Sequence, residues 1–421
     1  MARIAPLRAL HYDLARVGSL DAVCSPPYDV IDDEHRARLA ARSPFNVVEI
    51  DLPRADGGDD PYLHAQTTLD AWRQQGILVR DREPALWALT QEFTGPDGNA
   101  YTRRGFFARV RVEDYGPGRI RPHERTHPGP KEDRLRLTRA TRANLSPIFS
   151  LFSDPGGDAW GALEPATRAQ EPFGALTDED GTRHTLWRVG DPGAIAAVER
   201  ALAPSELLIA DGHHRYETAR VYAEEVGGEG EHRWVLMFLC ALEDPGLAVF
   251  PTHRLLTDLD ADKQERLAEA LREHFEITEI EPERLEPAPD EEGVCLGYMD
   301  RHFRRAFRLR LKDQAIADRA LPGRSDAYRR LDTAVLEALV LRGALGMTDH
   351  DIDEKRGLDY SKDFADALDA VRSGRCDAAF FMRATPVEQV REVAAAGESM
   401  PPKSTYFFPK IPTGLVFNLL E

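Results

Sequence analysis

Apolar runs of strand length alternate with helical segments along most of the chain, and this alternation limits the possible folds more than any other feature. The strand-length runs are FNVVEIDL, PALWALTQEF, GFFARVRV, SPIFSLF, SELLIAD, WVLMFLCAL, GVCLGYM, AFRLRL and CDAAFFM. Helical patterning predicts helices near residues 33–43, 61–76, 131–144, 192–203, 213–225, 262–275, 325–344, 361–373 and 386–396. Strands that alternate with helices are typical of α/β and mixed α+β architectures. The sequence therefore predicts a mixed α/β fold.

Turn-rich segments divide the chain into candidate domains. With 421 residues, the chain is long enough for two or three domains of ordinary size. We expect an N-terminal α/β region over residues 1–230 and a C-terminal α/β region over 231–421. The stretch EPERLEPAPDEEG (281–293), which is rich in proline and acids, is the best candidate for a linker.

The chain is strongly acidic, with a formal net charge of −18 at pH 7. Such a charge repels nucleic acid, because nonspecific affinity for its backbone comes from phosphate neutralisation. We therefore expect no general DNA or RNA binding. The net charge does not exclude binding of a small anionic ligand in a local pocket.

Neither a membrane segment nor an export signal is expected. The sequence has no run of eighteen apolar residues, and acids and arginines interrupt the amino terminus where a signal peptide is apolar. The four cysteines lie far apart without a C-x-x-C pair, which disfavours a zinc ribbon and a disulfide framework. We expect a cytoplasmic protein with reduced cysteines.

The stretch LLIADGHHRYETA (207–219) places unusually dense chemistry at a predicted strand-to-helix corner. Gly212 allows backbone to approach a ligand, and the free N–H groups of the following helix attract phosphate. Asp211 can hold a divalent cation and act in catalysis with His214, while His213 and Arg215 can bind phosphoryl oxygens. The alternative is a simple helix cap, but turn chemistry alone explains only the Asp and the Gly.

A second cluster extends from Arg119 to Phe152. Between residues 119 and 142 it carries eight lysines or arginines against three acids, a strong contrast with the acidic chain. His123 and Glu124 precede a proline-rich loop and are candidates for proton transfer. The candidate phosphate-binding residues are Arg125, Lys131 and Arg134, the last two on one helical stripe with Thr138. The alternative is a solvated basic helix whose arginines pair with surface acids.

The third cluster is MPPKSTYFFPKIPTGLVF (400–417), which contains no acid. Its aromatic, proline-stiffened sequence favours docking over fraying, so it can carry Lys403, Ser404, Thr405 and Lys410 into a site. The alternative is an edge strand that packs through its aromatic residues.

Two weaker signals complete the set. PPYDVID (26–32) is a tight loop in which Tyr28 and Asp29 can face a ligand, although it also fits a plain turn before a helix. His253 and Arg254 follow a strand, where such a pair is more often structural.

Taken in order, PPYDVI, HERT, ADGHHRYETA and MPPKSTYFFPK resemble the uncharacterised prokaryotic family catalogued as domain of unknown function 1015. The corner is also similar to the phosphate-binding corner of the ParB and sulfiredoxin superfamily, which implies a ParB/sulfiredoxin-like core with large insertions. Members of that superfamily bind nucleotides there, and some small relatives phosphorylate free serine with an upstream glutamate as base. The resemblance implies that residues 211–215 match the corner and that Glu124 is the candidate base.

The leading hypothesis is phosphoryl transfer involving a small hydroxylated metabolite, with free serine or phosphoserine as the first guess. Such transfer depends on positioning, charge neutralisation and an oriented nucleophile. Asp211 with Mg²⁺ and the helix start would hold a nucleotide such as ATP or ADP, while Arg215 with Lys131 or Arg134 would neutralise charge. Glu124 would take the hydroxyl proton.

Three alternatives stay open. The same site can hydrolyse a phosphomonoester, or it can be a nucleotide-binding switch that changes the oligomeric state of a homo-oligomer without catalysis. Metal-dependent hydrolysis would use the histidines, but their spacing lacks the i, i+4 pair of an H-E-x-x-H helix.

Overall fold

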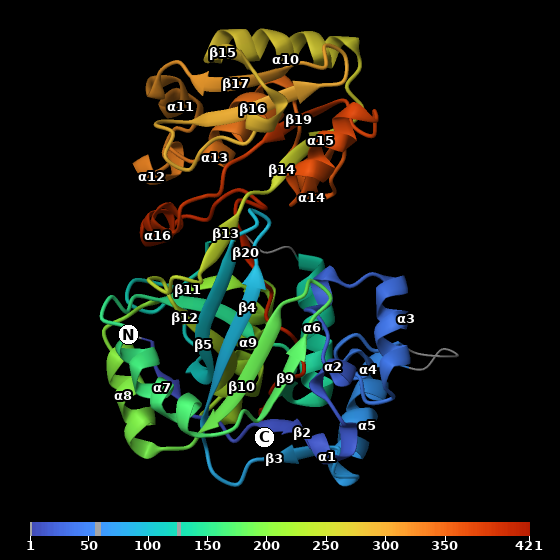
Figure 1. Cartoon of the computed structure of the whole chain (residues 1–421), viewed down its shortest axis with the longest axis vertical. Coiled ribbons are helices and arrows are strands. Elements are labelled where there is room, and N and C mark those ends of the chain that lie inside the picture. Colours follow the sequence, from blue (N-terminus) through green and yellow to red (C-terminus); the bar gives the residue numbers. More distant parts are fainter. Residues whose placement is uncertain (1, 55–59, 124–127) are drawn as a thin grey trace. The chain divides into compact units, whose positions relative to one another are not determined.

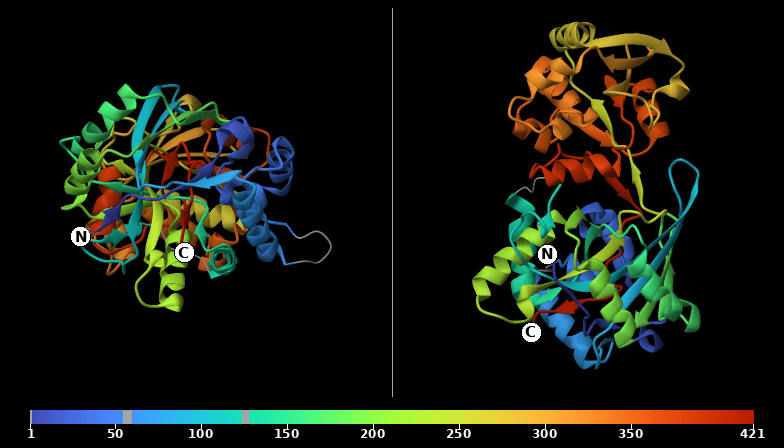
Figure 2. Two further views of the ribbon diagram at one scale, coloured as in Figure 1. Left: turned by 90° about the horizontal axis from the view of Figure 1, so that it is seen from below. Right: turned by 90° about the vertical axis from the view of Figure 1, so that its left-hand side faces the viewer.

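The computed structural model describes residues 2–54, 60–123 and 128–421 (Figure 1). The chain divides into two compact units, and each is described by itself. The first unit comprises Met1–Pro122, Thr126–Ala248 and Pro409–Glu421, and the second unit comprises His123–Arg125 and Val249–Phe408. Figure 2 shows that the C-terminal end of the chain, coloured red, belongs to the first unit.

The division differs from the boundary that the sequence predicts near residue 230. β12 (Trp234–Ala241) pairs with both β5 (Ala100–Arg111) and β8 (Ile148–Phe152), so the strand after residue 230 belongs to the sheet of the first unit. The expected linker 281–293 lies inside the second unit, between β15 (Phe275–Ile280) and β16 (Cys295–Asp300). It therefore connects two strands of one unit.

A mixed sheet forms the centre of the first unit. Within the described residues it has nine strands, in the order β6-β11-β8-β12-β5-β4-β10-β9, with β1 paired to β5. The strands not yet given are β6 (Ile120–Arg121), β11 (Leu207–Asp211), β4 (Leu86–Thr94), β10 (Arg183–Val189), β9 (Gly174–Thr177) and β1 (Ile4–Ala5). β11 runs parallel to β6 and antiparallel to β8. Its end is the predicted strand-to-helix corner.

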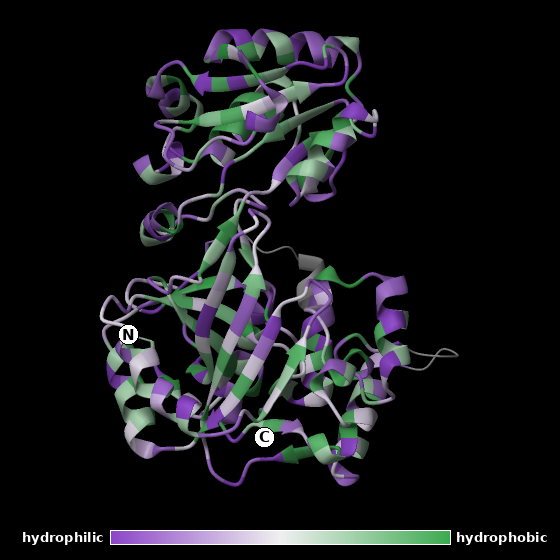
Figure 3. Ribbon diagram, in the orientation of Figure 1, coloured by the Kyte–Doolittle hydropathy of each residue, from purple (hydrophilic) through white to green (hydrophobic). Residues whose placement is uncertain are grey.

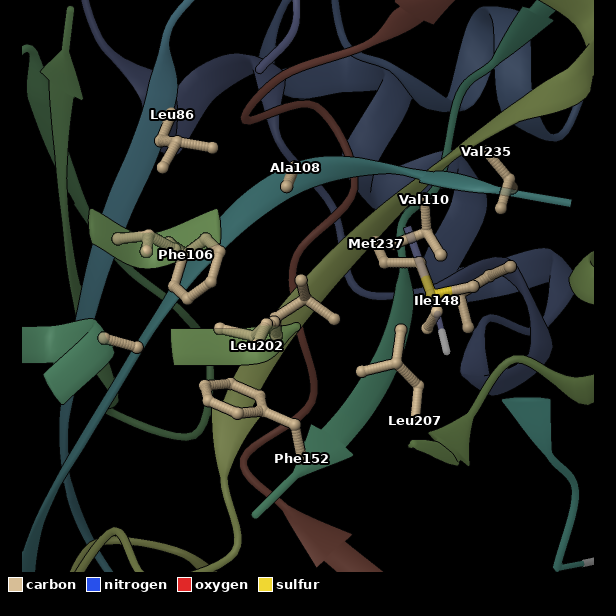
Figure 4. Close-up of a cluster of buried hydrophobic side chains, with 14 of the residues drawn as sticks. Leu86, Phe106, Ala108, Val110, Ile148, Phe152, Leu202, Leu207, Val235 and Met237 are labelled. Atoms are coloured by element: carbon tan, nitrogen blue, oxygen red, sulfur yellow. The ribbon is translucent and has the colours of Figure 1, made fainter. Parts of the chain in front are cut away.

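The core of the first unit is built from side chains of these strands and of the helices that pack on them. Figure 4 shows Leu86 of β4, Phe106 of β5, Phe152 of β8 and Met237 of β12 gathered around Leu202 of α8 (Pro192–Leu202). All five are at most 2% exposed. Each such side chain contributes about 1.5–3 kcal/mol when it leaves water, so this cluster fixes the sheet that carries the corner.

Most expected helices are present within one to three residues of their predicted ends. They are α3 (Asp33–Arg42), α5 (Pro61–Gln74), α6 (Pro128–Thr141), α8, α9 (His213–Val226), α10 (Ala261–His274), α15 (Phe364–Arg372) and α16 (Val387–Ala395). The expected helix 325–344 is divided into α12 (Asp326–Arg329), α13 (Asp332–Leu336) and a π-helical segment, η4 (Glu337–Ala344). Helices that the sequence did not predict include α1 (Leu14–Val17), α2 (Leu20–Val23), α7 (Asp158–Ala169), α11 (Gln314–Ala320) and α14 (Asp349–Asp353).

One expected strand is wrong. FNVVEIDL contains the short helix α4 (Val48–Asp51). The Asn46 side chain accepts the N–H of Val48 at 3.2 Å and so favours a turn at this point. The run is apolar because Val47, Val48 and Ile50 are all buried, and a short, fully buried run does not distinguish a strand from a helix.

Among its described residues, the second unit has a six-stranded sheet and two hydrophobic cores. Its order is β15-β17-β16-β19-β14-β18, where β17 is Ala306–Leu311, β19 is Ala378–Phe381, β14 is His253–Leu256 and β18 is Leu358–Ser361. Neighbouring residues enter opposite cores: Phe380 packs with Leu267 of α10, whereas Phe381 packs with α15. Figure 3 shows hydrophobic and hydrophilic residues alternating along α10, as expected for a helix with one buried face.

Two further findings concern the sequence expectations. Across the described ranges, no helix combines the length and the hydropathy that crossing a membrane requires. All four cysteines lie in described segments, where they are buried and form no disulfide.

Candidate functional site

The corner between β11 and α9 has the backbone geometry that its glycine suggests. Gly212 has φ 93° and ψ 30°, in the left-handed region that other residues rarely adopt. A Cβ at this position would also come within 3.0 Å of the Arg215 guanidinium. The glycine is therefore needed twice, for the turn itself and for the approach of Arg215 to the start of α9.

Asp211, at the end of β11, lies between two cations. Its carboxylate is 3.2 Å from Lys410 Nζ and 3.4 Å from Arg215 Nη2. Burial opposes ionisation of this carboxylate, but the charges of Lys410 and Arg215 outweigh it and hold the pKa of Asp211 well below its usual value. Asp211 is therefore ionised, and two predicted phosphate-binding residues meet at it.

Arg215 is almost fully buried, with 10% of its side chain exposed. Nη1 donates a hydrogen bond to the Pro147 carbonyl. Burial disfavours the charged guanidinium and is the largest single influence, but the negative charge of Asp211, together with smaller effects of Asp29 and its neighbours, outweighs it and raises the pKa of Arg215. In the part of the chain that the structure describes, the buried Nε of Arg215 has no hydrogen-bond partner.

A cavity of about 40 Å³ in the first unit brings the corner together with the basic helix. Its polar lining residues are Tyr28, Asp51, Arg134, Thr138, Asn144, Ser146, Arg215 and Thr218. The Arg134 guanidinium lies 4.2 Å from the centre of the Tyr28 ring and donates to the Asp51 carbonyl at 2.7 Å. Within the described segments, Thr218 Oγ1 is a second buried polar atom without a partner. Such atoms point to an additional polar group at this place.

Lys410 is held at Asp211 by a buried clamp that the sequence analysis missed. Arg103, which is fully buried, donates to the Pro409 carbonyl and, at 2.9 Å, to Gln91 Oε1. Gln91 Nε2 donates to the Lys410 carbonyl at 3.2 Å. Burial lowers the pKa of Arg103 to about 10, so the guanidinium stays charged at neutral pH. A single arginine in a strand pattern gives no sequence signal for this role.

His123, Lys403, Ser404 and Thr405 belong to the second unit. His123 Nε2 is 2.9 Å from Thr405 Oγ1, and the His123 carbonyl accepts the N–H of Met400 at 2.7 Å. The Ser404 hydroxyl donates to the Pro401 carbonyl at 2.7 Å. These contacts fasten the terminal segment inside the second unit.

The edge strand that was the alternative for this segment is present. β20 (Tyr406–Phe408) pairs with β13 (Ala248–Phe250). Arg254 supports the preceding turn, because its Nη2 donates to the Lys403 carbonyl at 3.1 Å. His253 is fully buried, which agrees with the structural reading of the His-Arg pair.

The remaining predicted site residues differ in what the structure describes of them. Glu124 and Arg125 lie outside the described residues, and Lys131 is placed only as part of α6. His213 is buried and His214 half-buried in the first turn of α9. Their predicted roles stay predictions.

The surroundings of Asp211 fit a phosphate better than a divalent cation. Mg²⁺ is bound by oxygen ligands such as carboxylates, and the positive charges of Lys410 and Arg215 already neutralise the carboxylate of Asp211. Across the described ranges, no group of three or more His, Cys, Asp or Glu side chains is arranged to hold a metal ion.

Comparison with known proteins gives a family and a set of distant folds. A family model described as "Protein of unknown function (DUF1015)" matches residues 4–334. No curated protein matches the chain.

Three solved structures are similar at low identity. A conserved hypothetical protein from Pyrococcus furiosus is 17% identical with a TM-score of 0.35, over 70% of this chain and 92% of that one. A free serine kinase in complex with AMP is 17% identical with a TM-score of 0.37, over 70% and 89%. SbnI from Staphylococcus aureus, with a C-terminal truncation, is 10% identical with a TM-score of 0.37, over 74% and 87%. None of them assigns a role to a residue of this chain.

Proposed function

The chain belongs to the family described as "Protein of unknown function (DUF1015)", a description that assigns no reaction, and from the site geometry we propose that it transfers a phosphoryl group to or from a small hydroxylated metabolite. Free serine and phosphoserine are the first substrates to test. A nucleotide such as ATP or ADP is the proposed donor or acceptor.

One observation carries the proposal, the cluster of Asp211, Arg215 and Lys410 at the start of α9. Two cations face one carboxylate, so a positive charge remains for an incoming anion. The start of a 14-residue helix adds the positive end of its dipole, which attracts anions. Within the described residues, the buried Nε of Arg215 has no hydrogen-bond partner, so it adds one more donor.

These groups suit phosphoryl transfer because the reaction needs orientation and charge neutralisation more than covalent help. In the proposed step, the amides after Gly212 hold the phosphate, with His213 and His214 as further donors. Arg215 and Lys410 neutralise the charge on the transferred group. The bond between phosphorus and the acceptor hydroxyl forms as the donor bond breaks, and Glu124 takes the hydroxyl proton.

The test is a thermal-shift screen of the full chain with ATP, ADP, pyrophosphate and phosphoserine. A ligand that binds only the native state raises its melting temperature, so at least one of these phosphates should do so. Lys410→Gln should reduce the shift, because it removes a charge at the phosphate. The matched control is Lys355→Gln, which removes an exposed lysine that pairs with Asp359 in the second unit.

Each outcome decides between functions. Binding followed by transfer to serine supports the proposal, and release of free phosphate alone would make the protein a phosphomonoester hydrolase. Nucleotide binding with no product would favour the switch. If none of the four ligands raised the melting temperature, the proposed phosphate site would be contradicted.

A further inference from the structure

The second unit contains a cavity of about 410 Å³ that takes no part in the proposed phosphoryl transfer. Its walls come from α10 on one side and from β15, β16 and β17 on the other, with residues 301–305 at the turn between β16 and β17. Cavities of roughly 300–1,000 Å³ with mainly apolar walls and a few polar groups are typical of small-molecule sites. The size is therefore that of a ligand site.

The walls combine buried and exposed apolar side chains. Leu267, Leu271 and Leu309 are at most 4% exposed, while Ile277 and Phe303 are 41% and 67% exposed. Leaving large apolar side chains in water costs roughly 25 cal/mol for each Å² of exposed apolar surface. An apolar ligand body that covers Phe303 and Ile277 would recover part of this free energy.

The polar lining is mainly cationic. Arg272 comes from the last turn of α10, and Arg301 and Arg305 come from the turn between the strands. The two carboxylates of the lining are already engaged by backbone. Asp300 accepts the N–H of Phe303 at 2.7 Å, and Asp377 accepts the N–H of Leu259 at 2.8 Å.

The arginines keep free surface for an anion. The side chain of Arg301 is 52% exposed although it pairs with Asp377, and that of Arg305 is 63% exposed although it pairs with Glu279. The Arg305–Glu279 pair is exposed on both sides and so contributes little to stability, whereas the Asp377 carboxylate that pairs with Arg301 is largely buried. The cavity thus offers an apolar floor and a positively charged edge.

We propose that this cavity binds a small organic acid with an apolar body, whose carboxylate pairs with the arginines at the edge. The hydrocarbon or aromatic part lies against Leu271, Phe307 and Phe303. This cavity shares no residue with the cluster of Asp211, Arg215 and Lys410, and it would bind a different kind of ligand. The proposal therefore does not depend on the proposed phosphoryl transfer.

The experiment follows displacement of the fluorescent probe anilinonaphthalene sulfonate from the full chain by octanoate and by octanol. The two competitors share an apolar chain, and only octanoate carries a charge. Octanoate should displace the probe at a concentration about threefold lower than octanol, the range of an exposed ion pair. Equal potency would overturn the pairing with arginine.

Variants locate the ligand. Ala268→Trp fills the cavity from a half-buried position of α10 and should abolish displacement by octanoate. Arg272→Gln should weaken it about threefold. Arg372→Gln is the matched control, because Arg372 is an exposed arginine in the last turn of another helix, α15, and it should leave displacement unchanged.

A second variant distinguishes loss of octanoate binding from misfolding of the chain. Phe303→Ser changes a side chain that is already 67% exposed. The variant should therefore fold normally and still bind octanoate more weakly than wild type. Unchanged octanoate binding in both Ala268→Trp and Phe303→Ser would overturn the proposal. It would also be overturned if the wild-type chain bound no octanoate and instead formed a dimer that Phe303→Ser abolishes.

Discussion

Asp211 keeps its negative charge in a largely buried position because Lys410 and Arg215 both contact it. Removing one charged member of a largely buried group leaves an uncompensated charge, which costs more than the intact group contributes. A partly exposed arginine at a helix start contributes little to folding, so from its place in the sequence Arg215→Ala would be expected to change stability little. The structure changes that expectation, because Arg215 is nearly buried and also holds the Pro147 carbonyl.

The first prediction concerns Asp211→Asn. The variant should lose about 3 kcal/mol of unfolding free energy at pH 7, since the largely buried Arg215 and the partly buried Lys410 both lose the carboxylate that offsets their charge. The lowered pKa of Asp211 means that its stabilisation is complete above the unfolded pKa, near 4, and disappears only as the pH falls below it. Urea unfolding should give the same difference in unfolding free energy between wild type and Asp211→Asn at pH 7 and at pH 5. A difference that shrinks across this range would show that Asp211 titrates there.

The second prediction concerns His253 in the second unit. Burial, with a smaller effect of Arg254, lowers the pKa of His253 to about 4. Between this value and about 6.5, where the unfolded chain protonates, the unfolded state binds the extra proton. Stability of the second unit should therefore fall by about 2–3 kcal/mol as the pH decreases from 7 to 4.

The measurement compares urea unfolding of wild type and His253→Phe across this range. Phenylalanine suits the neighbours Phe364 and Phe381, although it leaves the Met382 N–H without its acceptor. The variant should therefore be less stable at pH 7 but lose less stability on acidification. Parallel pH profiles for the two chains would contradict a neutral buried histidine.

At the scale of elements, the hydrophobic periodicity of the sequence was sufficient to predict helices that are long and have one buried face. α9 and α10 lie within one residue of their expected ends. The prediction failed at Val48–Asp51, where all-round burial of Val47, Val48 and Ile50 removes the alternation that distinguishes strand from helix. It also gave one continuous helix where the structure has α12, α13 and η4.

The candidate site shows the same limit. The residues 211–215 were found because five unusual types adjoin in sequence, whereas Gln91 and Arg103 meet Lys410 only through the fold. Hydrogen bonds between residues some 300 positions apart leave no local pattern. The clamp nevertheless supports the position of Lys410.

The third prediction tests this clamp with Gln91→Leu. The change removes the Gln91 acceptor of the Arg103 guanidinium and the Gln91 donor to the Lys410 carbonyl, so residues 409–413 should exchange their amide hydrogens faster. Gln74→Leu is the control, because Gln74 is exposed on α5. Hydrogen exchange followed by mass spectrometry should show the change in the first variant alone, and unchanged protection in Gln91→Leu would mean that the clamp does not hold the segment.

At the scale of the whole molecule, the chain leaves the first unit after residue 248 and returns to it at residue 409. Phe417 and Leu419 are at most 2% exposed, and the Leu10 N–H donates to the Phe417 carbonyl at 3.0 Å. β21 (Asn418–Leu419) pairs with β7 (Ala143–Asn144). The sequence located a docked terminal segment but not the unit into which its end docks, because the partners lie hundreds of residues away.

The fourth prediction is that deletion of residues 409–421 unfolds the first unit. The segment buries Ile411, Leu415, Val416, Phe417 and Leu419, each worth about 1.5–3 kcal/mol, a total comparable with the stability of a whole domain. Calorimetry should show that the transition of the first unit is lost while that of the second unit survives. A truncated chain with both transitions intact would contradict the architecture.

The most direct test of the proposed function is phosphorus NMR of the full chain mixed with ATP and serine. The account predicts a phosphoserine signal that grows in step with ADP. Glu124→Gln, which keeps the size of the side chain and removes its charge, should strongly lower turnover and leave phosphate affinity nearly intact. Spectra in which ATP and serine persist unchanged beside the wild-type protein, with no displaced phosphate signals from ATP, ADP or phosphoserine, would contradict the claim that Asp211, Arg215 and Lys410 form a phosphoryl-transfer site.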